Sequence, residues 1–303
     1  VVISEGVESI GDGAFSDCTS LKTIILPDQF CDDNKRVRLG IDKSVQCIPY
    51  SEHIKSITTE NSTNTISKFG YLVNKSMNIS SKKNMLNSME TALPIEGGST
   101  EDHKEEVDTS NVFTIPSTIK EIIKEYVNTN IKDSKYITHI VISEGVKSIG
   151  EFAFRDCIIL KSIVIPEGIE SIGEGAFYNC TSLASIVIPE GVKSIGQRTF
   201  ESCERLKSIV IPKGVETVGT LAFAYCTSLE SVVISESVKK IHPSAFRNCT
   251  SLKSVVIAEG IINIGRFAFQ SCTSLTSITI PASNKIINYR TFCDCTSLES
   301  VVI

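Results

Sequence analysis

Hydrophobic and polar positions recur along most of the chain with a period of 23 residues. In the unit formed by residues 160–182, apolar residues first alternate with other residues, at Leu160, Ile163 and Ile165, and Pro166 follows. This alternation predicts a β-strand, which proline ends because it has no amide hydrogen to donate to a ladder. A turn at Glu167-Gly168, a second short apolar segment and a second turn come next.

The unit then has Ala176, Phe177 and Cys180 with i, i+1, i+4 spacing, which predicts one helical or 3₁₀ turn. The Phe column contains Phe15, Phe154, Phe177, Phe200, Phe223, Phe246, Phe269 and Phe292. The Cys column contains Cys18, Cys157, Cys180, Cys203, Cys226, Cys249, Cys272 and Cys295. A fixed period of this length predicts a solenoid, in which each unit buries its apolar side chains against its neighbours. Its strands would form a parallel sheet with rungs about 4.8 Å apart.

The composition is that of an ordinary soluble protein. The 303 residues are 41% hydrophobic and 21% charged, and the net charge is −5. This charge is too small and too mixed to suggest nucleic acid as a partner. No stretch approaches the roughly 18–20 apolar residues of a spanning helix, so we expect no membrane-spanning segment.

The eleven cysteines raise the question of disulfides. Eight of them share one position of the repeat, where parallel Cβ vectors suit disulfides poorly, so we expect buried free thiols. Cys31 and Cys47 lie off this column and could pair in a secreted protein. Cys293 and Cys295 form a C-x-C, but the nearest histidine, His242, lies about fifty residues away, and we expect no metal site.

Catalytic patterns are missing from the sequence. The four histidines are scattered, and no phosphate-binding, dinucleotide-binding, zinc-protease or nucleophile-elbow motif is present. We therefore predict that the protein is not an enzyme and uses no cofactor.

The string I-P-E-G-V-K-S-I-G-x-x-A-F-x-x-C-x-S-L-x-S-I-V resembles the BspA-like, or type-5, leucine-rich repeat family. The resemblance covers residues 1–30 and 142–303 closely. It implies an α/β solenoid, a right-handed horseshoe with its parallel sheet on the concave face and short helical turns on the other side. It also implies a surface or secreted protein that acts in adhesion and protein binding without catalysis.

The repeat fails once along the chain. We expect an N-terminal repeat segment at residues 1–30, an island insertion at 31–112, a degenerate repeat with a helix at 113–141, and seven regular repeats at 142–303. A helix is predicted at about 118–128, with Thr118 and Glu121 as a capping box. The island is expected to be partly ordered to about Ile57 and mobile from Thr58 to Ser110.

Two columns of strand residues should face away from the core. The candidate binding residues on the concave face are Val164, Ser185, Val187, Ser208, Val210, Ser231, Val233, Ser254 and Val256. An exposed apolar stripe of this kind can mark a binding surface, although β-branched residues also simply suit strands. A third column alternates in charge through Lys147, Glu170, Lys193, Glu216 and Lys239, and is expected to hold surface ion pairs.

Three functions remain open. The concave sheet could bind a protein or glycan of a host cell or matrix, the island could carry recognition, or the chain could be a spacer in a larger surface protein. The strand residues at both ends of the chain have no polar capping unit. We therefore expect further repeats of the same protein at both ends, or pairing of the ends with other chains.

Overall fold

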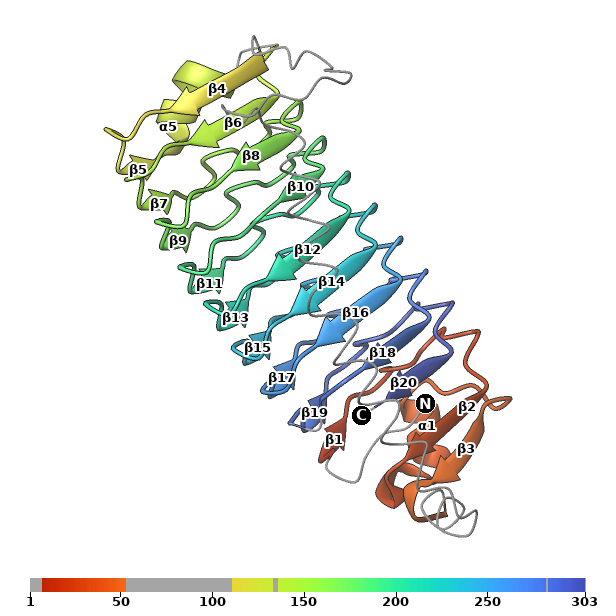
Figure 1. The fold of residues 1–303 in the computed structure, drawn as a ribbon. Helices are drawn as coiled ribbons and strands as arrows, with labels where there is room; N and C mark the ends of the chain where they lie inside the picture. Colours follow the sequence, from red (N-terminus) through yellow and green to blue (C-terminus); the bar gives the residue numbers. More distant parts are fainter. Residues whose placement is uncertain (1–6, 53–110, 133–135, 282, 303) are drawn as a thin grey trace, which may run out of the picture. The chain divides into compact units, whose positions relative to one another are not determined.

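Parallel strands stack into a solenoid in the computed structural model, which describes residues 7–52, 111–132, 136–281 and 283–302 (Figure 1). Each regular rung contains a long strand, a short strand and a turn segment that ends at the repeated Cys. We call the three sides of the stack the long-strand face, the short-strand face and the turn face. The predicted solenoid fold is confirmed, whereas the curvature that would make one face concave stays a prediction.

The long strands arise where apolar and polar residues alternate, and they pair in parallel with their neighbours. In chain order they are β2 Thr23–Leu26, β3 Gln46–Pro49, β4 Val112–Ile115, β6 His139–Ile142, β8 Ser162–Val164, β10 Ser185–Ile186, β12 Ser208–Ile211, β14 Ser231–Ile234, β16 Ser254–Ile257, β18 Ser277–Thr279 and β20 Ser300–Val302. They pair in the groups β10-β8-β6-β4, β12-β14-β16, β18-β20 and β2-β3.

The short strands form one continuous parallel sheet of nine strands, in the order β1-β19-β17-β15-β13-β11-β9-β7-β5. They are β1 Ser9–Ile10, β5 Glu121–Ile122, β7 Ser148–Ile149, β9 Ser171–Ile172, β11 Ser194–Ile195, β13 Thr217–Val218, β15 Lys240–Ile241, β17 Asn263–Ile264 and β19 Ile286–Ile287. In each of them the second residue is buried, so it packs into the core between the long-strand face and the short-strand face.

The Ala-Phe-x-x-Cys segments are turns, so the helical turn predicted there is wrong. The residue before each Cys has a positive φ of 59–62°, which ends any right-handed helical turn. These residues are Asp17, Asp156, Asn179, Ser202, Tyr225, Asn248, Ser271 and Asp294. Successive turns are joined by backbone hydrogen bonds, as where Phe154 N donates to Ala176 O at 2.7 Å. The turn face is therefore a third hydrogen-bonded side of the stack.

The core consists of columns of identical residues. Phe154 and the Phe of each rung up to Phe269 stack with ring centroids 5.2–5.3 Å apart. The eight column cysteines are buried, as the period predicts. Seven of their thiols donate to the Phe carbonyl of the neighbouring rung at 3.1–3.3 Å. Cysteine at this position thus fills space and satisfies a buried carbonyl.

The N-terminal repeat stacks on the C-terminal rung of the same chain. Strand β1 pairs in parallel with β19, the rings of Phe15 and Phe292 are 6.0 Å apart, and Lys285 Nζ lies 2.7 Å from Glu8 Oε1. We expected the edge at β19 to meet further repeats or another chain, and the chain's own first repeat occupies it here. Stacking order in space therefore differs from order in sequence.

The two outermost described rungs carry the helices. One rung contains the 3₁₀ segment η1 Asp28–Phe30 and the helix α1 Asp33–Arg38, and the other contains α5 Lys124–Val127 followed by the π-helical segment η3 Asn128–Lys132. The helix predicted at 118–128 starts too early, because residues 121 and 122 form β5 and pair with β7. The predicted capping box is therefore wrong, and α5 begins after Ile123 without a side-chain cap.

The first part of the predicted island belongs to the stack. Strand β3 pairs in parallel with β2, and Leu39, Ile41 and Val45 are buried in the same core. The segment predicted to be mobile, from Thr58 to Ser110, lies outside the described residues. The division of the chain into four segments stays a prediction.

Candidate functional site

The predicted Val column runs in register along the long-strand face. Val210 pairs with Val233, Val233 pairs with Val256, and Val141 pairs with Val164. The side chains are half-buried, between inward Ile and Val side chains that are mostly buried. The column is therefore partly covered by its neighbours and presents its outer surface to solvent.

The Ser column runs beside the Val column, and each Ser directly precedes the first buried residue of its strand. Ser162 pairs with Ser185, and Ser208, Ser231 and Ser254 follow one another in register. Ser254 is exposed and the others are half-buried. The structure thus brings the candidate residues together on one face.

Strand pairing on this face is interrupted at β10. This strand ends at Ile186, so Val187 lies just beyond it, and β12 begins a new group of paired strands. The backbone contact that remains is weak, with Lys207 N donating to Ala184 O at 3.4 Å. The stripe therefore consists of two blocks of paired strands that meet near Val187.

The alternating charge column produces one ion pair at its first step. Lys147 Nζ lies 3.3 Å from Glu170 Oε1, and both side chains are more than half exposed. Screening by water makes such a pair weak. Further along the column, the backbones of Lys193, Glu216 and Lys239 are joined by hydrogen bonds.

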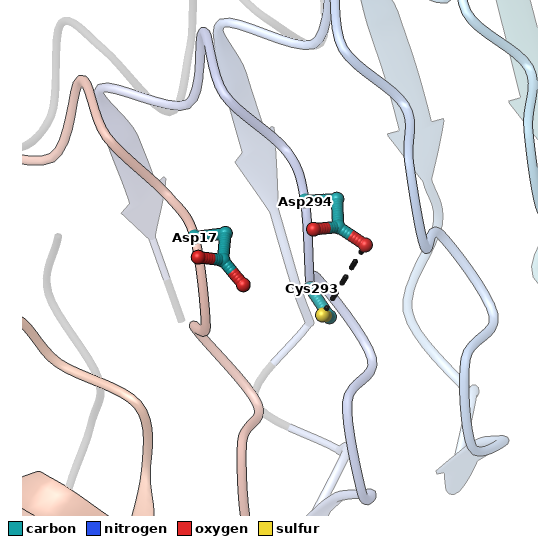
Figure 2. A group of neighbouring side chains, drawn as sticks. All are labelled: Asp17, Cys293 and Asp294. Atoms are coloured by element: carbon teal, nitrogen blue, oxygen red, sulfur yellow. Dashed lines mark hydrogen bonds between the residues drawn. The ribbon is translucent and has the colours of Figure 1, made fainter.

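A cluster that the sequence does not reveal lies where the N-terminal repeat meets the C-terminal rung. Figure 2 shows Asp17 on one rung beside Cys293 and Asp294 on the next, and their potential ligand atoms all lie within 4.8 Å of one another. Asp17 and Asp294 occupy the same positive-φ position in their turns. Equivalent positions meet wherever rungs stack, but the sequence did not reveal that these two rungs are neighbours.

We assign no metal to this cluster. Asp294 Oδ2 already accepts hydrogen bonds from Gln270 Nε2 at 3.3 Å and from Ser271 Oγ at 3.4 Å. Burial and the neighbouring Asp294 charge raise the pKa of Cys293 to about 11, so its thiol keeps its proton at neutral pH. The second thiol of the C-x-C does not join the cluster, because Cys295 Sγ donates to Phe269 O at 3.1 Å.

The column thiols are poor nucleophiles for the same physical reason. Burial raises the pKa of Cys18 and of Cys272 to about 12, against an ordinary value of 9.0. Cys31 and Cys47 are half-buried free thiols near the end of the stack. Their pairing in an oxidising compartment stays a prediction.

The remaining chemistry offers no catalytic arrangement among the described residues. Thr138 Oγ1 lies 2.8 Å from His139 Nδ1, and burial lowers the pKa of this histidine. A hydroxyl and an imidazole alone lack the orienting acid of a nucleophilic site. No described helix is both long and apolar enough to cross a membrane.

Comparison with known proteins adds one strong finding. A family profile described as BspA type leucine-rich repeat region, present in six copies, matches residues 1–92, 122–249 and 218–303. No curated protein matches significantly.

Solved structures provide weaker likenesses. A leucine-rich repeat protein of T. pallidum, TpLRR, is 29% identical over 56% of this chain and 79% of its own, with a TM-score of 0.49. A leucine-rich cell surface protein of Faecalibacterium prausnitzii is 24% identical over 64% and 69%, with a TM-score of 0.45. Since both scores are low, the profile alone supports the assignment.

Proposed function

Because the chain belongs to the BspA-type leucine-rich repeat family, we propose that it is a non-catalytic module that binds a protein partner through its long-strand face. The observation that carries the proposal is the in-register Val and Ser stripe, which offers apolar surface beside hydroxyl groups on successive rungs. Apolar stripes rimmed by polar residues are typical of protein interaction sites. Adhesion of a surface or secreted protein to a host cell or matrix is the role we propose for it.

Replacing Val187, Val210 and Val233 with Lys tests this proposal in a cell- and matrix-adhesion assay. Three charges on the stripe should abolish adhesion, because desolvating them at an interface is costly. Far-ultraviolet circular dichroism and a thermal melt check that the solenoid survives. Should the triple variant unfold, Val210→Lys alone provides the same test with a smaller perturbation.

A matched control places the same charge elsewhere. Lysine at Ser171, Ser194 and Thr217 adds three positive charges to the short-strand face. We expect adhesion to persist in this control. Undiminished adhesion of the folded valine variant would overturn the proposed face, and equal loss in both variants would point to a general charge effect.

A further inference from the structure

A pocket of about 170 Å³ opens on the turn face, away from the long-strand face. Three successive rungs line it with Phe152, Arg155, Glu174, Tyr178, Gln197 and Arg198. Pockets for drug-sized ligands measure roughly 300–1,000 Å³, so this one suits a smaller group.

One wall of the pocket is a guanidinium group that lies near two aromatic rings. The Cζ atom of Arg155 lies 5.6 Å from the ring centroid of Phe152 and 5.1 Å from that of Tyr178. Its Nε lies 3.3 Å from Asp156 Oδ2. The rings pack near Cζ and the carboxylate lies on the Nε side, and the terminal nitrogens make no hydrogen bond to the described residues.

A second guanidinium group lies beside a carboxylate without a hydrogen bond to it. Arg198 Nε lies 3.6 Å from Oε2 of Glu201, whose residue is only 8% exposed. Burial raises the pKa of this glutamate, and the Arg198 charge opposes the rise. Two arginines thus line one small pocket with donor groups to spare, which is the arrangement that recognises a carboxylate.

The other walls supply acceptors and an apolar surface. Gln197 Nε2 donates to Glu174 Oε1 at 3.1 Å, which leaves the amide oxygen of Gln197 and the second carboxylate oxygen of Glu174 for other donors. Gly175, with φ of +56°, allows the Phe152 ring to lie against the backbone, because a Cβ there would meet that ring at 2.3 Å. A simple anion would use the arginines and leave the acceptors of Glu174 and Gln197 without donors. A ligand with both a carboxylate and hydroxyl groups uses every wall.

We propose that this pocket binds one residue of an acidic sugar, with its carboxylate on Arg155 and Arg198 and its hydroxyls on Glu174 and Gln197. The half-buried ring of Tyr178 offers a surface against which the apolar side of a sugar can pack. The site lies on a different face from the proposed protein-binding stripe and does not depend on it.

Titration of the full chain with glucuronate, followed by saturation-transfer nuclear magnetic resonance, tests this proposal. Arg198→Ala should weaken binding at least about tenfold, because it removes a charge-assisted contact. Arg198→Lys keeps the charge but loses the planar fork, and should weaken binding less. Arg205→Ala removes an exposed charge outside the pocket and should leave binding unchanged.

Two further probes separate a sugar site from an anion site. Glucose lacks the carboxylate and should bind much more weakly than glucuronate, and acetate lacks the ring and the hydroxyls. Equal affinity for acetate and glucuronate would overturn the sugar assignment. Absence of glucuronate binding at millimolar concentration, or equal effects of the Arg198 and Arg205 variants, would overturn the site. Because no protein partner is present, these failures leave the proposed function untouched.

Discussion

The long-strand face and the turn face are two sides of the same rungs. The outward residue of the long-strand face is nearly constant from rung to rung, whereas that of the turn face changes. On the long-strand face the outward valine is repeated from β6 to β16. On the turn face the residue after each core Phe differs from rung to rung, through Arg155, Tyr178, Glu201, Ala224, Arg247, Gln270 and Cys293. Strand residues must fit the neighbouring strands in register, which favours β-branched side chains. Successive turns are joined by backbone hydrogen bonds on every rung, so the residue after the core Phe can vary without breaking the stack.

This difference separates two kinds of recognition. A uniform stripe offers the same contact on each rung and suits an extended protein surface. An irregular face offers a particular group of side chains at one place, such as the pocket around Arg155 and Arg198. We therefore expect the two faces to be separable by mutation, provided that the core beneath both stays intact.

The largest effect should come from the core that the two faces share. Phe223 is fully buried between Phe200 and Phe246, with ring centroids 5.2 and 5.3 Å away. Phe223→Ala should cost about 3–5 kcal/mol of unfolding free energy, measured by chemical denaturation. Both binding activities should weaken together. Phe267 is a matched control because it is half-exposed and packs edge-on against Tyr289. An equal loss of unfolding free energy in Phe223→Ala and Phe267→Ala would contradict the placement of Phe223 in the core.

A smaller loss of stability should come from disturbing the contact between the N-terminal repeat and the C-terminal rung. A Cβ at Gly11 would lie 2.3 Å from Tyr289 N, whereas a Cβ at Gly168 would meet nothing nearer than 3.9 Å. Gly11→Val should cost about 1–3 kcal/mol or more, because the clash is with backbone. Hydrogen exchange should speed up in residues 7–26 and stay slow in the regular rungs. If Gly168→Val has the same effect, the close approach of these two rungs is wrong.

The sequence predicts the rung and its core, but not which rungs are neighbours. The columns of Phe and Cys, the strand at each L-x-x-I-x-I segment and the register of Val210 with Val233 follow from the period. Every rung has equivalent strands and core residues with which another rung can pair. Nothing in the period therefore shows that β1 pairs with β19. The cluster of Asp17, Cys293 and Asp294 depends on that pairing, and so it could not be predicted.

The turn face was mispredicted for a different reason. The i, i+1, i+4 spacing of Ala, Phe and Cys is the same in a helical turn and in the turn observed. The discriminating signal is the residue before Cys, since Asp156, Asn179 and Asn248 are of the types that tolerate a positive φ. The pocket could not be predicted, because it is built from the residues that do not repeat.

An effect confined to alkaline pH concerns the thiols, which hydrogen-bond to the backbone of the turn face. The folded pKa of Cys272 is raised from 9.0 to about 12, so its stabilising contribution is fully present below pH 9 and is lost as the pH rises toward 12. For this one thiol the slope should be about 1.4 kcal/mol per pH unit at most. Cys272→Ser keeps a donor to Phe246 O and does not titrate in this range, so its stability should fall less steeply. Parallel pH profiles of the two proteins would argue against burial as the cause.

The separability of the two faces is tested most directly by measuring both activities in both variants. The lysine triple at Val187, Val210 and Val233 should lose adhesion and keep its affinity for glucuronate. Arg198→Ala should lose at least about tenfold in glucuronate affinity and keep adhesion. Loss of both activities in either folded variant would contradict the account, because it would mean that one surface performs both tasks.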